Sequence, residues 1–425
     1  MEELMEKILE KDNLNKAYLQ VYRNKGSQGI DGMTVQELKS YLRNNGESIR
    51  KDLMEETYTP NPVLMVEIPK ENGKVRRLGI ATVVDRVIQQ SVSQVIMELI
   101  DKTFSDNSYG FRPNKSAHQA IKQANQYINE GYKYVVDIDL SQYFDTINHD
   151  KLMYLLTKEI KDSRVLRLIR KFLKGGIIKS GTKEETRVGC IQGSPLSPVL
   201  SNIYLNEIDK ELERRGHKFC RYADDLQIYV KSKRAGERVM RSVTKELEEK
   251  MKLKVNEEKS EVRYYTKTKF LGFTFHTKRK GKAVITPHRK SREKFKVKVR
   301  ELLKRNRGRK IEVVISQINL FLRGWINYYA ISEMKSFIEN MTSWIRRKIR
   351  VYIWKQWKKI KTRFKNLKRL GINQNKAWEY ANTRKGLWRI SSSPILNRTL
   401  TNDYIGKLGF KNPIKIYSEA HIKFL

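Results

Sequence analysis

The 425-residue chain is poor in cysteine and has no long apolar run. Cys190 and Cys220 are its two cysteines, and they form no Cys-x-x-Cys pair, which disfavours a disulfide framework or a zinc site and favours a reducing cytoplasm. No stretch approaches the roughly 18 apolar residues that a membrane helix needs. The acidic start MEELMEKILEKD is not typical of a signal peptide. We therefore expect no membrane partner.

Acidic residues are scarce relative to basic ones. Lys and Arg number 87 against 47 Asp and Glu, which gives a formal net charge of +40. Such an excess destabilises a compact fold by self-repulsion unless a polyanion is the usual partner. The composition therefore indicates a nucleic-acid-binding protein, and 425 residues are enough for two or three domains.

Hydrophobic periodicity predicts an α+β region with a split βαβ sheet, followed by a basic all-α region. Strands are expected at 66–69, 75–80 and 132–140, in a hairpin on either side of Tyr222–Asp225, and around 261–276; helices are expected at 82–100, 149–158, 162–173, 195–214 and 234–251. Residues 278–310 hold sixteen Lys and Arg, and residues 344–369 hold twelve with no acid. We expect domains at 1–276, with an N-terminal extension to about residue 60, at 277–365 and at 366–425.

The tetrapeptide Tyr222-Ala223-Asp224-Asp225 separates two apolar, strand-like runs. Two adjacent carboxylates at the tip of a hairpin repel each other, and aspartate is a poor strand residue. Divalent cations would cancel this repulsion, because hard cations take oxygen ligands. Asp139, at the end of another expected strand, could complete a site for two ions about 3.5–4 Å apart, as in metal-assisted phosphoryl transfer. An ordinary Asp-containing turn is the alternative for the Asp pair taken alone.

An ordered set of motifs resembles that of bacterial group II intron-encoded reverse transcriptases. The motifs are Gly29–Gly32, Asp85–Gln90, Tyr109–Asn114, Asp137–Asp145, Gln192–Pro198, Tyr222–Asp225, Leu253–Ser260, Phe270–Phe273 and Gly324–Tyr329. The resemblance implies a right-hand polymerase of fingers and palm, an all-α thumb or maturase domain, and a small basic C-terminal region that binds DNA. Together the motifs span roughly residues 5–390.

The resemblance also implies roles for single residues. Asp139, Asp224 and Asp225 would be the catalytic triad that binds two Mg²⁺ ions, for which Mn²⁺ can substitute. Phe144 lies five residues after Asp139 and would exclude the 2′-hydroxyl of the incoming nucleotide. Asp137 would then be a structural hydrogen-bonding residue.

Other motif residues would bind the nucleotide. Lys70 and Arg76 would grip the triphosphate, Gln192 would contact the incoming dNTP, and Lys259 would protonate the leaving pyrophosphate. Gly193 would let the backbone approach the template. The sequence reads Ile191-Gln192-Gly193-Ser194 where the family commonly has Pro-Gln-Gly-Gly, a departure that could alter the rigidity of this loop.

The remaining expected contacts are with nucleic acid. Phe270, Leu271 and Gly272 would form the primer grip. The residues expected to bind nucleic acid are Arg112, Gly193, Arg346, Arg347, Arg350 and Lys355. A stabiliser of its own turn is the alternative for Arg112, and a solvated charged face is the alternative for the basic runs.

The resemblance implies an RNA-directed DNA polymerase that copies RNA into cDNA and serves as a maturase in splicing a mobile group II intron. Its partners would be RNA template, intron RNA, DNA primer or target, and dNTPs, in the cytoplasm of a bacterium. Residues 390–425 contain no Cys pair or HNH-type cluster, so we expect no endonuclease domain. The alternatives are a host-domesticated relative in DNA repair or phage defence, a splicing factor with an inactive polymerase, and an RNA-dependent RNA polymerase.

Overall fold

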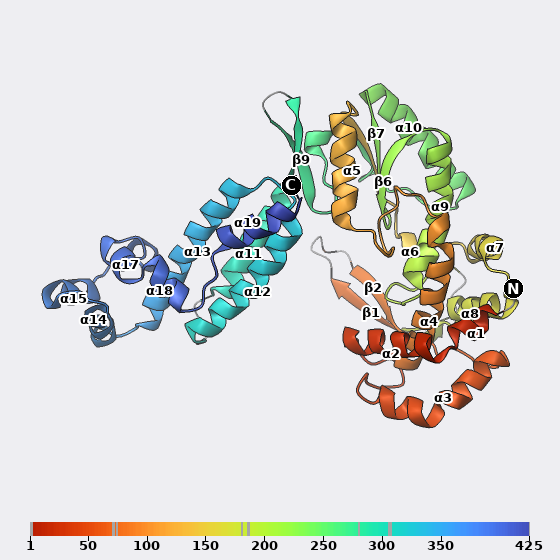
Figure 1. Cartoon of the computed structure of the whole chain (residues 1–425), viewed down its shortest axis with the longest axis horizontal. Coiled ribbons are helices and arrows are strands. Elements are labelled where there is room, and N and C mark those ends of the chain that lie inside the picture. Colours follow the sequence, from red (N-terminus) through yellow and green to blue (C-terminus); the bar gives the residue numbers. More distant parts are fainter. Residues whose placement is uncertain are drawn as a thin grey trace. The chain divides into compact units, whose positions relative to one another are not determined.

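The computed structural model describes residues 3–69, 73, 75–179, 182–184, 188–278, 281–304 and 308–424. The chain divides into two compact units, Met1–Thr268 and Lys269–Leu425. The first mixes helices and strands, and the second is a β-hairpin followed by helices (Figure 1). No helix in the described part of the chain is both long and apolar enough to cross a membrane.

The first unit is an α+β region, as expected. Its elements are α1 (Leu4–Ile8), α2 (Lys11–Asn24), α3 (Leu38–Met54), β1 (Val63–Pro69), β2 (Val75–Ile80), α4 (Val83–Ile100), α5 (Ala117–Asn129), β3 (Tyr134–Ile138), α6 (Tyr143–Thr146), α7 (His149–Glu159), α8 (Ser163–Lys174), β4 (Ile177–Lys179), β5 (Thr182–Glu184), α9 (Ser197–Arg214), β6 (Lys218–Tyr222), β7 (Asp225–Val230), α10 (Lys233–Lys245) and β8 (Glu261–Tyr264). The expected helix over 234–251 divides into α10 and the π-helical turn Glu246–Lys250.

A four-stranded sheet of order β6-β7-β3-β8 forms the centre of this unit, and every pair of neighbours is antiparallel. Val135 and Val136 of the inner strand β3 have no exposed surface. Helix α10 packs on β3, β7 and β8, while α5 packs on β6 and β7 (Figure 1). The strands form where apolar residues follow one another, because both faces of this sheet are covered.

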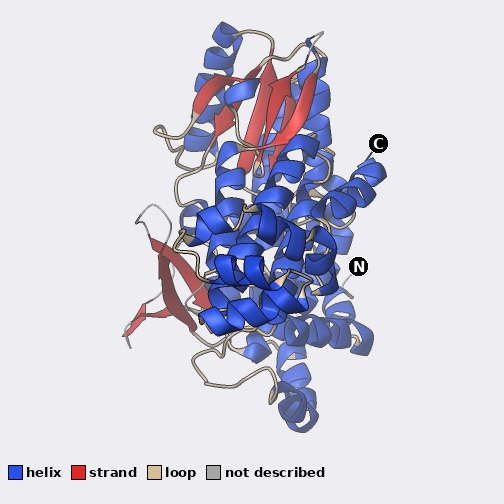
Figure 2. Ribbon diagram, turned by 90° about the vertical axis from the view of Figure 1, so that its left-hand side faces the viewer, coloured by secondary structure: helices blue, strands red, loops and turns tan. Residues whose placement is uncertain are grey.

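A second sheet has the order β2-β1-β4-β5, in which β1 and β2 form an antiparallel hairpin. Strands make up a minor part of the described residues, and helices make up most of the rest (Figure 2). Side-chain caps define where several helices begin. Thr82 Oγ1 accepts a hydrogen bond from the Asp85 backbone N–H and donates one to the Asp85 carboxylate, which fixes the start of α4.

The second unit contains β9 (Phe273–Thr277), β10 (Ala283–Pro287), α11 (Arg289–Leu302), α12 (Ile311–Tyr329), α13 (Lys335–Gln356), α14 (Ile360–Arg369), α15 (Gln374–Ala381), α16 (Leu387–Ile390), α17 (Pro394–Thr399), α18 (Asn402–Lys407) and α19 (Pro413–His421). Phe295, Trp325 and Phe337 form its aromatic centre, with ring centroids 4.7–5.8 Å apart. This compact unit begins at Lys269, and its first strand β9 pairs with β10 and not with the central sheet. The domain boundary expected at residue 277 stays a prediction. The further boundary at residue 366 stays a prediction.

A buried arginine joins the central sheet to α9. Arg221 of β6 is 1% exposed, and its Nε lies 2.8 and 2.9 Å from the two carboxylate oxygens of Asp209, which has no exposed surface. Its Nη1 donates to Asn202 Oδ1 at 3.0 Å and to the carbonyl oxygen of Ala223 at 2.9 Å. Burial raises the pKa of Asp209, and the charge of Arg221 opposes that rise. Each of the two buried charges therefore needs the other, because either one alone would be left buried without a partner.

Removal of one partner should destabilise the first unit. Arg221→Met leaves the Asp209 carboxylate buried and unpaired, so we expect the free energy of unfolding to fall by about 3–5 kcal/mol. Arg221→Met combined with Asp209→Leu should recover a large part of that loss, because no lone charge remains. Urea denaturation followed by circular dichroism measures both variants, with Arg234→Met on the exposed face of α10 as the control. A double variant no more stable than Arg221→Met would contradict this account.

Candidate active site at the Tyr222–Asp225 hairpin

The three predicted catalytic carboxylates lie at one end of the central sheet. Ile138 of β3 pairs with Leu226 of β7, so the same register continued by one residue sets Asp139 opposite Asp225. Asp224 lies in the turn between β6 and β7, where Tyr222 pairs with Asp225. Burial raises the pKa of Asp224, and the nearby charge of Asp139 raises it further, while Arg76 opposes the rise. The fold therefore brings Asp139 and Asp224 close enough to repel each other.

The chemistry of these side chains fits a divalent cation. Carboxylate oxygens are the ligands that Mg²⁺ prefers, and a cation would relieve the repulsion between Asp139 and Asp224. In the described ranges, however, no three His, Cys, Asp or Glu side chains are already gathered closely enough to hold one ion. The carboxylates of Asp139, Asp224 and Asp225 are thus suitable ligands and lie at suitable backbone positions. To bind an ion, their side chains would have to move closer together.

The loop that precedes β8 also holds Asp139 in place. The Asp139 backbone N–H donates to Ser260 Oγ at 3.0 Å, and the Asn256 N–H donates to the Asp139 carbonyl oxygen at 2.8 Å. Lys259 Nζ lies 2.9 Å from Asp139 Oδ2. The Lys259 side chain is 54% exposed, so this ion pair contributes little to stability. Its main consequence is to place an exposed cation beside the predicted reaction centre.

Asp137 has the structural contact that the sequence suggested. Gln227 of β7 donates from Nε2 to Asp137 Oδ1 at 3.3 Å, and the Tyr229 hydroxyl donates to Gln227 Oε1 at 3.0 Å. Asp137 therefore belongs to a polar network between β3 and β7. Because Asp137 is engaged in this network, Asp139, which directly follows β3, is the better candidate for binding a metal ion.

The turn that carries Asp224 is strained and tightly enclosed. Ala223 has a φ of 56°, a left-handed value that a two-residue hairpin usually assigns to glycine. A Cβ added to Gly110 would lie 2.3 Å from the Ala223 nitrogen, so only glycine fits at that neighbouring position. The bond from Arg221 to the Ala223 carbonyl oxygen stabilises this backbone conformation. The surrounding contacts fix the direction in which the carboxylates leave the sheet.

The β1–β2 hairpin meets the Gln192 loop through Arg76. Arg76 Nε donates to Gln192 Oε1 at 3.1 Å, and the Gly79 N–H donates to the Gln192 carbonyl oxygen at 2.8 Å. A Cβ on Gly79 would lie 2.1 Å from Ile191 Cγ2, and one on Gly193 would lie 2.8 Å from the Gly79 carbonyl oxygen. Arg76 and Gln192, two predicted nucleotide-binding residues, thus touch each other, and Gly79 and Gly193 permit the close approach of the hairpin to the loop.

Ser194, at which the sequence departs from the family pattern, has a specific contact. Its hydroxyl donates to Oε1 of Gln89 in α4 at 2.5 Å, and Gln89 is 4% exposed. Ser197 Oγ donates to the Ile191 carbonyl oxygen at 2.7 Å, which closes the loop at its other end. A glycine at position 194 could not form the bond to α4. The loop that presents Gln192 therefore has an extra anchor in this chain.

Loss of this anchor should weaken nucleotide binding. Ser194→Gly removes one hydrogen bond, worth about 0.5–1.5 kcal/mol, so we expect the KM for dNTP in primer extension to rise about two- to tenfold with kcat nearly unchanged. Ser194→Thr, which keeps the hydroxyl, should retain the wild-type KM. Gln89→Met should match Ser194→Gly, and the double variant should be no worse than either single one. Additive effects in the double variant would contradict a shared bond.

Phe144 follows the central sheet on α6. It is half-buried against the hydrophobic core, and its ring meets that of Tyr143 edge-on with centroids 5.2 Å apart. The Phe144 carbonyl oxygen accepts a hydrogen bond from the Cys190 N–H at 2.7 Å, just before the Gln192 loop. The backbone of Phe144 is thus tied to the loop that carries the predicted nucleotide contact. Its role as a sugar selector stays a prediction.

The predicted primer grip is a tight turn in the second unit. Phe270 and Phe273 exchange two backbone hydrogen bonds of 3.0 and 2.8 Å, and Leu271 and Gly272 form the tip with φ values of 50° and 85°. The Tyr328 hydroxyl donates to the Leu271 carbonyl oxygen at 2.9 Å. The Gly324–Tyr329 motif therefore supports the Phe270–Phe273 motif. Phe270 is 2% exposed, so its side chain serves as a core residue and only the tip could contact a ligand.

Two predicted contacts need correction or fall outside the structure. The side chain of Arg112 is 4% exposed and pairs with Asp101 Oδ1 at 2.7 Å. It also donates to the carbonyl oxygens of Asp101, Ser105 and Ser108. Its donors are consumed by its own turn, which corrects the expectation that Arg112 binds nucleic acid. Lys70 lies outside the described residues.

The basic residues of α13 differ in their surroundings. Arg347 donates to Ser391 Oγ and to the Trp388 carbonyl oxygen, and its guanidinium lies 3.8 Å from the Trp388 ring centroid. Arg350 donates to the Leu400 carbonyl oxygen at 2.8 Å, and burial lowers the pKa of both Arg346 and Arg350. Arg347 and Arg350 fasten the following segment to α13, whereas the Nε of Arg346 is buried without a hydrogen-bond partner among the described residues and Lys355 is exposed. Their contact with nucleic acid stays a prediction, most directly for Lys355.

Sequence reasoning missed the residues that hold the candidate site in place. Arg221, Asn202 and Asp209 form one buried network, and Ser260 binds the backbone of Asp139. A charged residue between Cys220 and Tyr222 in an apolar strand was the available signal for Arg221. Its partners could not be found in this way, because they lie 12 and 19 positions away along the chain.

Comparisons with known proteins agree with this arrangement. Residues 68–275 match the family model described as reverse transcriptase (RNA-dependent DNA polymerase). Residues 292–371 match the model described as group II intron, maturase-specific domain. The first match covers the central sheet and its predicted catalytic residues. The chain therefore contains a reverse transcriptase domain, a class that generally uses divalent metal ions, followed by a helical maturase domain. Both domains imply binding of nucleic acid.

Individual relatives define the family. Protein YkfC of Escherichia coli (strain K12) is 32% identical over 272 residues, which cover 55% of this chain and 71% of that protein. Group II intron-encoded protein LtrA of Lactococcus lactis subsp. cremoris is 36% identical over 222 residues, or 50% of this chain and 36% of LtrA. The chain belongs to the group II intron reverse transcriptase/maturase family.

Solved structures with a similar fold are more distant. A telomerase from Candida albicans in complex with a fragment of telomeric RNA has 12% identity and a TM-score of 0.46, covering 83% of this chain and 64% of that chain. A Cas6-RT-Cas1--Cas2 complex has 22% identity and a TM-score of 0.36, covering 57% and 26%. These likenesses are too weak to carry an argument about this chain.

Proposed function

We propose that the chain is the RNA-directed DNA polymerase of a mobile group II intron, with a second role as a maturase in splicing of intron RNA. The observation that carries the first role is the meeting of Asp139 and Asp224 at the end of one antiparallel sheet, with Arg76 close enough to oppose their charge. In this proposal the β1–β2 hairpin belongs to the fingers, the central sheet is the palm, and the helices of the second unit form the thumb.

Asp139, Asp224 and Asp225 would hold two Mg²⁺ ions. Those ions would activate the primer 3′-hydroxyl and neutralise the departing pyrophosphate. Arg76 and Gln192, which already touch, would meet the incoming dNTP, with Arg76 on its phosphates. Lys259 would exchange its contact with Asp139 for the leaving pyrophosphate and deliver a proton there.

The maturase role is supported by the match to the maturase-specific domain and by the basic surface. The net charge of +40 exceeds what the few cations at the candidate active site account for, and Lys355 is exposed on α13 of the matched region. A large basic surface favours a long, folded polyanion over a mononucleotide. Intron RNA is such a partner, and DNA primer or target would bind at the polymerase site.

Asp224→Asn tests the polymerase proposal and separates its two roles. Extension of a DNA primer on an RNA template with dNTPs and Mg²⁺ should fall by about 10²–10³-fold or more, because one oxygen ligand loses its charge. Splicing of a group II intron RNA in the presence of the protein should be unchanged. The same variant without divalent metal should melt at a higher temperature than the wild type, since a repelled, half-buried charge is gone.

The metal dependence of melting supplies the control. Mg²⁺ should raise the melting temperature of the wild-type protein, because a ligand that binds only the folded state stabilises it. It should raise that of Asp224→Asn less. Wild-type rates of extension in Asp224→Asn would sink the active-site assignment, and equal Mg²⁺ effects on both proteins would remove Asp224 from the metal site.

Phe144→Ala tests the choice of sugar. A shortened side chain leaves room for a 2′-hydroxyl, so we expect discrimination of dNTP over rNTP, measured as the ratio of kcat/KM values, to fall about 10–100-fold. Phe144→Tyr keeps the ring and should preserve the wild-type ratio. Unchanged discrimination in Phe144→Ala would assign sugar selection to another residue.

A further inference from the structure

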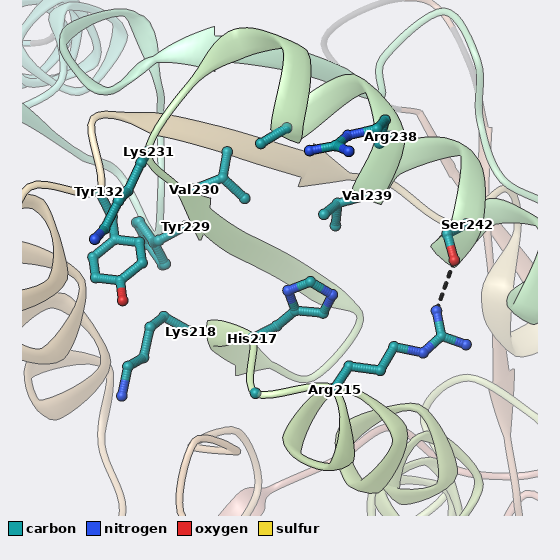
Figure 3. Close-up of a pocket in the computed structure, with 12 residues that line it drawn as sticks. Tyr132, Arg215, His217, Lys218, Tyr229, Val230, Lys231, Arg238, Val239 and Ser242 are labelled. Carbon is teal, nitrogen blue, oxygen red and sulfur yellow. Dashed lines mark hydrogen bonds between the residues drawn. The ribbon is translucent and has the colours of Figure 1, made fainter.

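The first unit contains a basic hollow at the end of the central sheet opposite the carboxylates. Its volume is about 540 Å³. Its walls are the start of β6, the end of β7, helix α10 and the turn after α9 (Figure 3). Asp224 lies at the other end of these two strands, and Asp139 follows the neighbouring strand β3 at that same end. At about 3.3 Å per strand residue, the two places are separated by roughly 15 Å.

The walls of the hollow carry cations and no acid. Its basic residues are Arg215, Lys218, Lys231 and Arg238. Arg215 is already paired with Glu211 and Glu246. The other three, Lys218, Lys231 and Arg238, are exposed and form no ion pair with a carboxylate among the described residues. Three uncompensated cations around one concavity raise the local concentration of anions.

Flat rings share this hollow with the cations. Tyr132 lies beside Lys231, whose Nζ is 5.6 Å from the ring centroid, and His217 points into the hollow between Lys218 and Arg215 (Figure 3). Burial and the charge of Arg215 lower the pKa of His217, which keeps its imidazole neutral and suited to stacking. Bases of single-stranded nucleic acid stack on such rings while cations track the phosphates.

We propose that this hollow binds a nucleotide of an RNA strand, with its phosphates on Lys218, Lys231 and Arg238 and its base against Tyr132 or His217. The choice of RNA follows from the family of the chain, but the site is separate from the polymerase centre and its test does not depend on polymerisation. The hollow would hold RNA at the end of the palm sheet that is remote from synthesis. An acidic peptide could satisfy the cations, but would leave the rings without a partner.

The test compares two triple variants of the full chain. Lys218→Gln, Lys231→Gln and Arg238→Gln together remove the three cations of the hollow. Lys233→Gln, Arg234→Gln and Arg241→Gln remove the same charge from exposed positions of α10 that do not line it. Primer–template is bound first to fill the polymerase site, and binding of a fluorescent single-stranded RNA of mixed sequence is then measured against salt concentration.

The variant of the hollow should lose about tenfold or more in RNA affinity, and its slope of log K against log salt should be shallower by about two units, from three lost contacts to a single strand. The control should keep the wild-type slope, and both variants should extend a primer normally. Equal losses in the two variants would overturn the site, since they would show only the effect of net charge.

Crosslinking locates the RNA directly. RNA carrying 4-thiouridine should crosslink on irradiation to the peptides that contain Tyr132 or His217. An excess of competing RNA without 4-thiouridine should abolish these crosslinks. Absence of both crosslinks from a protein that still binds RNA would overturn the proposal. Their loss with micromolar uridine monophosphate would also overturn it, by making the hollow a site for free nucleotide. Failure of primer extension by the wild-type chain would affect the polymerase proposal alone.

Discussion

The buried guanidinium of Arg221 connects the packing of the first unit to the geometry of its candidate active site. It neutralises Asp209 on α9 and also donates to the carbonyl oxygen of Ala223, inside the turn that presents Asp224. A buried charge demands a partner with good geometry, since its desolvation is otherwise uncompensated. The same interaction therefore fixes α9 against the sheet and holds a left-handed turn in place. The carboxylates depend on it without touching it.

Electrostatic repulsion is built into the site that this network supports. Asp224 is half-buried beside Asp139, and both effects raise its pKa. Stored repulsion is a stability cost that functional sites commonly carry. Lys259 on the loop before β8 and Arg76 on the β1–β2 hairpin both reduce that repulsion. Both cations lie on exposed segments, so they can change partners when phosphates arrive.

Positive charge in this chain has at least three physical uses. Arg112 and Arg347 close turns and fasten neighbouring segments through hydrogen bonds within the protein. Arg76 and Lys259 lie at the candidate reaction centre. Lys218, Lys231 and Arg238, which have no carboxylate partner among the described residues, line a separate hollow at the far end of the same sheet. A net charge of +40 indicates a polyanion but does not distinguish these uses, which depend on burial and on the nearest carboxylates.

The sequence by itself determined the α+β class, the order of most helices and strands in the first unit, and the motifs that mark a reverse transcriptase. It did so because apolar periodicity and hairpin turns are local signals. The choice of Asp139 over Asp137 as candidate ligand came from the family resemblance, through the spacing to Phe144, and stays a prediction. Only the tertiary structure decided that Arg112 is internal, that Phe270 is a core residue, and that Ser194 is bonded to Gln89. Those outcomes rest on contacts between residues distant in the chain, and no local pattern encodes how a side chain is buried or which partner it meets.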